Sequence, residues 1–327
     1  MEKLIIQIPC FNEQDTLAET VADLPKSIPG IDCVEYLVID DGSSDDTVKV
    51  ARENGVHHIL SLGQNRGLAW AFSQGLEKCL QEGATIIVNT DADNQYDGSC
   101  IKDIVKPILL EEADMVVGAR PVSEIAHFSF IKKLLQKVGS STVRKLSGTS
   151  VQDAPSGMRA FSQDMAMRLF IHNEYTYTME SLIQAGQSGY KVESVPIRVN
   201  GETRPSRLVK NNFSYVMRSA GAILRAYFLY QPFRLFGSIA FVLLSIATAL
   251  GFRFLWHYFT SSGDGMIQSL LLVVICSILG FISLGFGVVC DLNAANRRLL
   301  EDIRYKTRKI ELANIQATTL TSEANSD

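Results

Sequence analysis

The chain has 327 residues, of which 46% are hydrophobic and 20% are charged, and its mean hydropathy is positive. This composition excludes an intrinsically disordered chain, a collagen-like repeat and a disulfide-stapled scaffold, while the length allows one large domain or two modest ones. The net charge of −4 conceals a division of charge, because residues 1–197 carry a net charge of −10 and residues 198–327 a net charge of +6.

Short apolar runs rich in isoleucine and valine alternate with helix-length stretches along residues 1–118. Runs of this kind are typical of strands buried on both faces of a parallel sheet. We expect strands at residues 3–8, 35–39, 85–90 and 114–118, and helices at residues 14–24, 45–54, 66–82 and 99–112. The alternation predicts an α/β, Rossmann-like fold with a mostly parallel sheet.

A polar cluster follows each of the first three expected strands. The clusters read PCFNE at residues 9–13, DDGSSDDT at residues 40–47 and DADNQ at residues 91–95. In a doubly wound sheet, ligands bind beyond the carboxyl ends of the strands. One edge of the sheet should therefore gather five acidic side chains, namely Glu13, Asp40, Asp41, Asp91 and Asp93. This convergence predicts the functional site.

Several nucleotide-binding and metal-binding motifs are absent from the sequence. It has neither a GxxxxGK[ST] phosphate loop nor a GxGxxG turn after a strand, and a calcium loop starting at Asp91 would meet Tyr96 and Lys102 where it needs Gly and Glu. Asp91 and Asp93 instead offer hard oxygen ligands that suit Mg²⁺ or Mn²⁺ holding a diphosphate. Each motif alone is more often a simple turn, but their joint occurrence at strand ends favours a site.

Residues 198–235 form a strongly basic segment. It contains seven Lys and Arg residues but only one Glu, and apolar residues recur at helical spacing within it. This pattern predicts an amphipathic helix that lies on an anionic membrane surface. Residues 128–146 have a similar character, which fits an ordinary surface helix equally well.

Two long apolar runs follow, at residues 237–259 and 267–290. Each exceeds the roughly 20 residues that a helix needs to cross a bilayer. The second run has no charged residue, and the first carries Arg253 and His257 only near its end. Buried core helices are the alternative, but soluble helices are seldom apolar on every face. We therefore predict a transmembrane hairpin.

The distribution of basic residues predicts the orientation of this hairpin. Residues 260–266 between the spans contain no Lys or Arg, whereas basic residues flank both outer ends. The positive-inside rule places both termini and the front domain in the cytoplasm, in an integral protein of the inner membrane. Residues 1–24 lack the features of a signal peptide, and the six cysteines lack metal-like spacing, so we expect reduced thiols. Nucleic acid is disfavoured as a partner because membrane spans flank the basic segment.

With these motifs in this order, the sequence resembles family-two glycosyltransferases of GT-A fold. Within that family it is similar to the polyprenyl-phosphate sugar transferases, the group of dolichol-phosphate mannose synthases and bactoprenol glucosyltransferases. The motifs cover roughly residues 3–210, and the two spans match the membrane-anchored bacterial branch. Tyr96–Gly98 departs from the family, since many relatives have His-Pro-Pro there.

The resemblance implies roles for individual residues. A nucleotide donor would contact a first group: Pro9, Phe11, Glu13, Val38, Asp40, Asp91 and Ala92. A divalent metal, Mg²⁺ or Mn²⁺, would be held by Asp91, Asp93 and Gln95. Asp93, Arg120 and Asp153 would act in catalysis, with Arg120 near the phosphates and Asp153 where acceptor and donor meet. A basic loop with Arg204, Ser206 and Arg207 would close on the phosphates.

The resemblance also implies a reaction, which is the metal-dependent, inverting transfer of a sugar from a nucleotide sugar to a polyprenyl phosphate. The bacterial relatives favour a UDP-sugar, and GDP-mannose is the alternative. A non-catalytic nucleotide-sugar binding protein and a processive polysaccharide synthase are further hypotheses, although the latter's QxxRW motif is missing. Relatives of this kind often self-associate, so the resemblance also allows a homo-oligomer.

The expected organisation has four parts. Residues 1–207 form a cytoplasmic GT-A domain, and residues 208–235 form the interfacial amphipathic helix. The transmembrane hairpin occupies residues 236–291, and residues 292–327 form a cytoplasmic C-terminal tail.

Overall fold

The computed structural model describes most of the chain and divides it into two compact units. The first unit consists of Met1–Ser219 and Glu301–Asp327, and the second of Ala220–Leu300. The described residues are 1–121, 147–171, 177–200, 230–260 and 267–324, with the isolated positions 141, 143, 144, 221 and 228. Most of the predicted amphipathic helix, most of residues 128–146 and all of the predicted basic loop lie outside the described residues.

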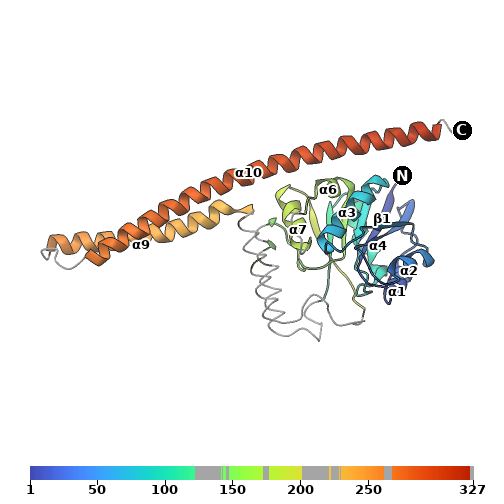
Figure 1. Ribbon diagram of the computed structural model, residues 1–327, viewed down its shortest axis with the longest axis horizontal. Helices are drawn as coiled ribbons and strands as arrows, with labels where there is room; N and C mark the ends of the chain where they lie inside the picture. Colours follow the sequence, from blue (N-terminus) through green and yellow to red (C-terminus); the bar gives the residue numbers. More distant parts are fainter. Residues whose placement is uncertain are drawn as a thin grey trace. The chain divides into compact units, whose positions relative to one another are not determined.

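A seven-stranded sheet with the order β3-β2-β1-β4-β6-β5-β7 forms the centre of the first unit (Figure 1). Its strands are β1 (Lys3–Cys10), β2 (Cys33–Asp40), β3 (His58–Ser61), β4 (Ile86–Asn89), β5 (Met115–Ala119), β6 (Arg159–Ser162) and β7 (Val192–Pro196). Neighbours pair in parallel except around β6, which is antiparallel to both β4 and β5. The predicted α/β fold with a mostly parallel sheet is thus confirmed.

Helices follow the strands and pack on the sheet. They are α1 (Leu17–Asp23), α2 (Thr47–Glu53), α3 (Leu68–Gln81), α4 (Ile101–Leu109), α6 (Gln163–Arg168) and α7 (Thr178–Gln187), with a short 3-10 turn at Gly98–Cys100. Alternate residues of β1 face different layers. Leu4, Ile6 and Ile8 join the core cluster with α1 and α4, whereas Gln7 approaches Gly75 of α3, where an added Cβ would meet the Gln7 side chain at 2.4 Å. Both faces of the central strand are therefore covered.

Four of the seven strands were predicted from the sequence, and β3, β6 and β7 were not. These three have four or five residues each, and β3 and β7 are half exposed, so neither forms an apolar run. β6 begins with the charged Arg159, and only Ala160 and Phe161 in it are apolar. Edge position and antiparallel pairing, which determine where these strands lie, leave little trace in local composition.

An ion cluster joins the three parallel strands β1, β2 and β3. Glu35 on β2 accepts bonds from Lys3 on β1 at 2.8 Å and from His58 on β3 at 2.7 Å. Burial alone would raise the pKa of Glu35, but the bonds from Lys3 and His58 outweigh it and hold the pKa below its usual value. This cluster therefore favours the carboxylate form of Glu35 in the folded chain.

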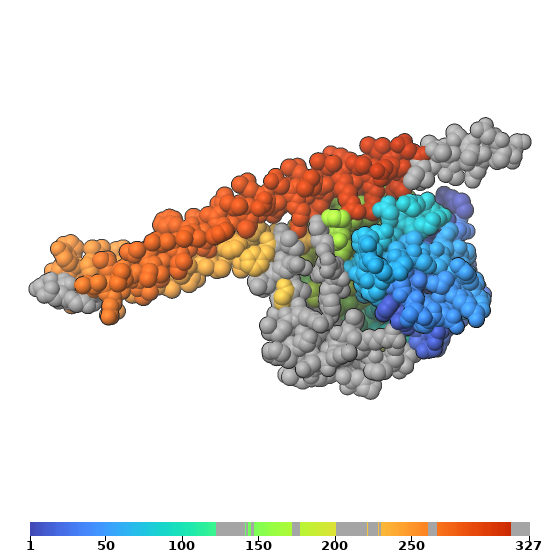
Figure 2. All heavy atoms as spheres, in the orientation of Figure 1, coloured from blue at the N-terminus to red at the C-terminus, as the bar shows by residue number. Residues whose placement is uncertain are grey.

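The second unit contains a hairpin of two apolar helices, α9 (Pro232–Thr260) and the first half of α10 (Ile267–Ala324). The helices touch through small residues, since a Cβ added at Gly280 would meet Leu244 at 2.8 Å, and Ser283 donates a hydrogen bond to the carbonyl of Phe236. Both are long and apolar enough to cross a membrane. Only 11% of the most apolar 18-residue stretch of α9 and 22% of that of α10 are buried. In Figure 2 the two orange helices run side by side. Their exposed apolar surface is unlike that of a buried core helix.

Helix α10 is longer than the predicted span. It continues without a break from the apolar run to Ala324, whereas the predicted apolar run ends at Cys290. The continuation is polar and is supported by pairs at i and i+4, such as Asp302 with Lys306 at 3.1 Å. Hydropathy marks only the part of the helix that suits a bilayer, and so it missed this extension.

The end of α10 packs against the α/β domain within the first unit. Arg308, which is 6% exposed, forms an ion pair with Glu77 of α3 and donates to the carbonyl of Met167 at 3.2 Å. The hydroxyl of Tyr305 donates to Asp164 of α6 at 2.5 Å. Because a buried charge that loses its partner is strongly destabilising, these contacts hold this part of α10 on the domain.

Candidate active site

Five strands place their connecting loops at one edge of the sheet. β1, β2 and β4 are parallel neighbours, so the segments after Cys10, Asp40 and Asn89 leave the sheet together. β5 points the same way and ends just before Arg120. Because β6 runs in the opposite direction, the loop that precedes Arg159 also reaches this edge. The predicted convergence of acidic strand ends is present, and it is joined by the loop at residues 153–157.

Asp91 lies at the centre of the charged groups. Burial, the nearby carboxylate of Asp93 and, to a smaller extent, that of Glu13 together raise its pKa to about 7, against the opposing effects of Arg120 and the Tyr96 hydroxyl. These effects place all four side chains in the electrostatic neighbourhood of Asp91. At neutral pH a negative charge on Asp91 is thus costly without an additional cation.

The Asp91 carboxylate rests against Gly157. A Cβ at Gly157 would lie 2.7 Å from Oδ2 and 2.8 Å from Oδ1 of Asp91, so only glycine leaves room for this carboxylate. Tyr96 hydrogen-bonds Asp91 through its hydroxyl, which also accepts the Gly157 backbone N–H at 2.9 Å. Burial raises the pKa of Tyr96 to about 12, so its hydroxyl stays protonated and can donate. Tyr96 and Gly157 together fix the position of Asp91.

Arg120 and Asp153 form a bidentate ion pair. Nε of Arg120 donates to Oδ2 of Asp153 at 2.7 Å, Nη2 donates to Oδ1 at 3.1 Å, and the Arg120 backbone N–H also donates to Oδ2 at 3.2 Å. The two side chains are 12% and 1% exposed. Burial opposes the charge on Arg120, but Tyr96, Asp153 and Asp91 outweigh it and raise its pKa. Arg120 is therefore a fixed cation beside Asp91.

A buried polar scaffold supports the loop at residues 153–157. Arg159 is fully buried, and its guanidinium donates to the carbonyls of Ala154, Ser156 and Thr178 and to the Ser181 hydroxyl. Burial lowers the pKa of Arg159 to about 10, which still leaves it charged at neutral pH. These bonds connect the loop to α7 and hold it in one conformation.

A second set of buried bonds joins β4 to the same loop. The Asn89 side chain donates to the Gly157 carbonyl at 3.0 Å and to the Tyr177 hydroxyl at 2.8 Å, and it accepts a bond from Gln7 at 2.9 Å. The Tyr177 ring stacks on Phe72 of α3, with ring centroids 3.8 Å apart. The network supports the backbone on which Asp91 rests. Gln7, Phe72, Asn89 and Tyr177 were not singled out from the sequence, since each belongs to an apolar or aromatic stretch.

Threonines at the start of α1 bond both Glu13 and the backbone next to Asp91. Thr16 donates through its hydroxyl to Glu13 at 3.1 Å and to the Ala92 carbonyl at 2.8 Å. Thr20 donates to the same carbonyl at 3.0 Å. The predicted site residues Glu13 and Ala92 are thus placed within one small network.

Asp40 and Asp41 both serve turns at the end of β2. Asp40 accepts the Ser43 backbone N–H at 2.9 Å, and Asp41 accepts those of Arg66 and Gly67 at 2.9 and 2.8 Å. Both carboxylates are buried, with 5% and 4% exposure. They shape the loops at this edge of the sheet.

The other residues predicted to contact a nucleotide differ in exposure. Phe11 is 40% exposed at the edge, whereas Pro9 is buried and Val38 is fully buried in the core. Arg204, Ser206 and Arg207 lie outside the described residues. The roles assigned to all these residues stay predictions.

The chemistry of the donor set fits a divalent cation. The carboxylate of Asp93, two residues from Asp91, helps to raise the pKa of Asp91, and the Gln95 backbone N–H donates to Asp93 at 3.2 Å within the same turn. Among the described residues, no three His, Cys, Asp or Glu side chains are arranged to hold a metal. Mg²⁺ is often bound by one or two carboxylates plus substrate phosphates. The pair fits that mode and does not form a complete protein cage.

Known proteins resemble the chain in sequence and in fold. An uncharacterised protein of Methanocaldococcus jannaschii is 31% identical over 60% of this chain and 81% of its own. The UDP-N-acetylglucosamine–dolichyl-phosphate N-acetylglucosaminyltransferase of Methanococcus voltae is 29% identical over 60% and 86%. Among solved structures, glucosyl-3-phosphoglycerate synthase from Mycobacterium tuberculosis, in complex with Mn²⁺, UDP and phosphoglyceric acid, has a TM-score of 0.54 and 18% identity over 68% and 78%.

The family model described as Glycosyl transferase family 2 matches residues 5–170, which is more than half of the chain. The matched region contains the acidic strand ends, Arg120, Asp153 and the first six strands of the sheet. The structural likeness shows a GT-A fold. This chain is a glycosyltransferase and belongs to glycosyl transferase family 2.

Proposed function

We propose that this protein transfers a sugar from a UDP-sugar to the phosphate of a polyprenyl phosphate, with inversion at the anomeric carbon, at the cytoplasmic face of a membrane. The observation that carries the proposal is the meeting of Asp91, Asp93, Arg120 and Asp153 at one sheet edge, in a chain with two exposed apolar helices. The name of the similar Methanococcus voltae protein, which specifies a UDP-sugar donor and a dolichyl-phosphate acceptor, supports it.

The reaction is a direct displacement. An oxygen of the lipid phosphate attacks the anomeric carbon, and the bond from that carbon to the diphosphate breaks with its electron pair leaving on UDP. The second pKa of a phosphate monoester is about 6, so the acceptor is mostly dianionic at neutral pH and needs no general base. The charge that develops on the leaving diphosphate is what the site must stabilise.

The charged residues have separate tasks in this proposal. Asp91, Asp93 and Gln95 would hold Mg²⁺ or Mn²⁺, and the bound ion would supply electrostatic stabilisation of the diphosphate. Arg120 adds a second, permanent positive charge. Because Arg120 occupies both carboxylate oxygens of Asp153, we assign Asp153 the task of orienting Arg120 and not that of a base.

The remaining predicted residues would form the nucleotide pocket. Glu13 and Asp40 are acceptors for base or ribose groups, and Phe11 is an exposed apolar surface at the same edge. Pro9, Val38 and Ala92 would shape the pocket through the backbone, since their side chains are buried. The predicted basic loop with Arg204, Ser206 and Arg207 would contact phosphates.

An assay for sugar transfer tests the enzymatic proposal. The full chain in lipid nanodiscs is mixed with Mn²⁺, undecaprenyl phosphate and one labelled donor at a time, chosen from UDP-glucose, UDP-N-acetylglucosamine and GDP-mannose. We expect label in the organic extract from a UDP-sugar and at least a hundredfold less from the Asp93→Asn variant. Asp103→Asn is the matched control, because Asp103 is an exposed carboxylate on α4.

Two outcomes would overturn the proposal. One is the absence of lipid-extractable label from every donor, and the other is full activity of the Asp93→Asn variant. Label from GDP-mannose alone would replace the proposed donor. Proton NMR of the product gives the anomeric configuration, and retention would exclude direct displacement.

The membrane orientation needs its own test. We infer that α9 and the first half of α10 span the membrane with residues 261–266 outside, because this connection has no Lys or Arg while both flanks are basic. Alkaline phosphatase, which is active only outside the cytoplasm, is fused after residue 263 or after residue 327. Activity of the second fusion and not of the first would show the opposite orientation.

A further inference from the structure

The segment that follows β7 runs along the loop that carries the metal-binding carboxylates. Residues 198–200, here called the strap, pair with this loop through an antiparallel bridge between Val199 and Tyr96. The backbone N–H of Asn200 donates to the carbonyl of Gln95 at 2.9 Å. The strap therefore adds a short strand-like pairing to the contacts that hold this loop.

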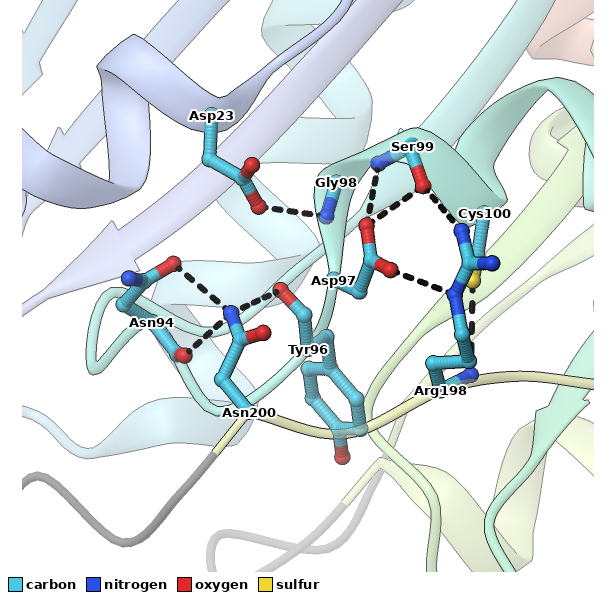
Figure 3. A network of polar contacts seen from close by, with 9 residues as sticks. All are labelled: Asp23, Asn94, Tyr96, Asp97, Gly98, Ser99, Cys100, Arg198 and Asn200. Atoms are coloured by element: carbon cyan, nitrogen blue, oxygen red, sulfur yellow. Dashed lines mark hydrogen bonds and ion pairs between the residues drawn. The ribbon is translucent and has the colours of Figure 1, made fainter.

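The side-chain NH2 group of Asn200 lies near three acceptors of the loop, to which its two N–H groups can donate. Its Nδ2 lies 3.1 Å from the Asn94 carbonyl oxygen, 3.4 Å from Asn94 Oδ1 and 3.5 Å from the Tyr96 carbonyl oxygen. Figure 3 shows the Asn200 amide between these two residues. Asn94 has a φ of 52°, a left-handed conformation that is unfavourable for most residues. The Asn200 amide thus stabilises the loop where its backbone is least favourable.

Arg198 bonds the next turn of the same loop. Its Nε donates to Asp97 at 2.6 Å, and its Nη2 donates to the Ser99 hydroxyl at 2.6 Å. Asp23 of α1 accepts the Gly98 N–H at 2.6 Å from the other side (Figure 3). The Arg198 side chain is 72% exposed, so solvent screens its ion pair and its contribution is smaller than that of Asn200.

A chain of contacts connects the strap to Asp91. Asn200 holds the Tyr96 backbone, and the Tyr96 hydroxyl bonds the Asp91 carboxylate and the Gly157 N–H. Residues 91–100 contain no proline, so hydrogen bonds and the packing of the buried Ala92 and Tyr96 side chains fix the conformation of this loop. Loss of the Asn200 amide would let Tyr96 shift and would release Asp91 from its place.

We propose that Asn200 is a positioning residue for the cation-binding carboxylates Asp91 and Asp93. The inference rests on the proposed function, since it assumes that these carboxylates bind a divalent cation. The side chain of Asn200 bonds Asn94 and Tyr96, so it acts on the carboxylates through the loop conformation. Its removal weakens cation binding while leaving the fold intact.

The test measures Mn²⁺ binding without turnover. Free Mn²⁺ is titrated by electron paramagnetic resonance against the full chain with UDP, for the wild type and the Asn200→Ala variant. We expect the Kd for Mn²⁺ to rise about tenfold, the effect expected from losing one or two hydrogen bonds. Hydrogen exchange at residues 94–97 should also quicken. Asn200→Gln, which keeps the amide, should recover part of the affinity.

The matched control is Asn54→Ala. Asn54 is an exposed asparagine at the end of α2, and its side-chain amide donates to the Val50 carbonyl at 2.8 Å. This variant should bind Mn²⁺ as the wild type does. Thermal unfolding of both variants separates a local effect on the loop from a general loss of stability. If Asn200→Ala proves too unstable to purify, Asn200→Ser takes its place with the same expectation.

The outcomes separate the inference from the function on which it rests. If the wild type binds no Mn²⁺, the metal-dependent function and the inference both fail. If the wild type binds Mn²⁺ and Asn200→Ala binds it equally well, only the inference fails. The inference also fails if Asn54→Ala loses as much Mn²⁺ affinity and as much thermal stability as Asn200→Ala. The loss of affinity would then not be specific to the loop.

Discussion

Replacing Gly157 by alanine should disable the site through a single methyl group. The added Cβ would lie 2.7 Å from Asp91 Oδ2, and ordinary contacts begin at 3.4 Å, so the carboxylate must move by about 0.7 Å. A misplacement of about 1 Å at an active site costs roughly 100-fold in rate. We therefore expect kcat/KM to fall about 20- to 100-fold. Crowding should also lower the free energy of unfolding by about 1–3 kcal/mol.

The assay is the transfer of labelled sugar to undecaprenyl phosphate, followed at varied Mn²⁺ concentration, with thermal unfolding measured in parallel. Gly285→Ala is the control, because Gly285 on α10 has open space around its Cβ position. It should keep the wild-type kcat/KM. If Gly157→Ala retains kcat/KM within twofold, the contact between Gly157 and Asp91 does not matter for catalysis and the assigned place of Asp91 is wrong.

Three further predictions concern buried charges. Asp153→Asn leaves Arg120 without its carboxylate partner, so kcat/KM in the transfer assay should fall at least 100-fold. The free energy of unfolding, measured by denaturant titration, should fall by about 3 kcal/mol. Wild-type values of both quantities would contradict this prediction. Glu35 has a lowered pKa, because ion pairs outweigh its burial, so its ionised form stabilises the fold above the unfolded pKa near 4.5. The stability difference between wild type and Glu35→Gln should shrink as pH falls below that value, and a difference independent of pH would refute the linkage. Arg308→Met should free the end of α10 from Glu77, so limited proteolysis should cleave the chain after residue 300 faster than in the wild type; unchanged cleavage would contradict the docking.

The strands and helices of the front half were predictable because their signals are local. Runs such as LIIQI in β1 are apolar on both faces, and such runs occur in buried parallel strands. The helix ends were less accurate, since α1 begins at Leu17 and not at residue 14. The half-exposed β7 has no comparable signal, because its place depends on pairing with β5.

Local patterns predicted only the acidic strand ends of the site, whereas Arg120 and Asp153 were named through the family resemblance. Asp91 and Asp93 follow a recognisable strand, so their place at the sheet edge follows from the rule for parallel strands. Gly157 gave no such indication, because its importance lies in its contact with the Asp91 carboxylate and in its bond to the Tyr96 hydroxyl, 61 residues away in the chain. Such contacts between distant segments are invisible to local patterns.

The sequence by itself determined the α/β class, the acidic strand ends and the two apolar helices, since each depends on the order of residue types within a short stretch. The tertiary structure alone decided that β6 runs antiparallel, and thereby brought Asp153 and Gly157 to the edge where Arg120 and Asp91 lie. It also decided that the strap reaches the carboxylate loop. The physical reason is that strand direction and long-range hydrogen bonds minimise the energy of the whole domain, while composition and periodicity report only on neighbouring residues.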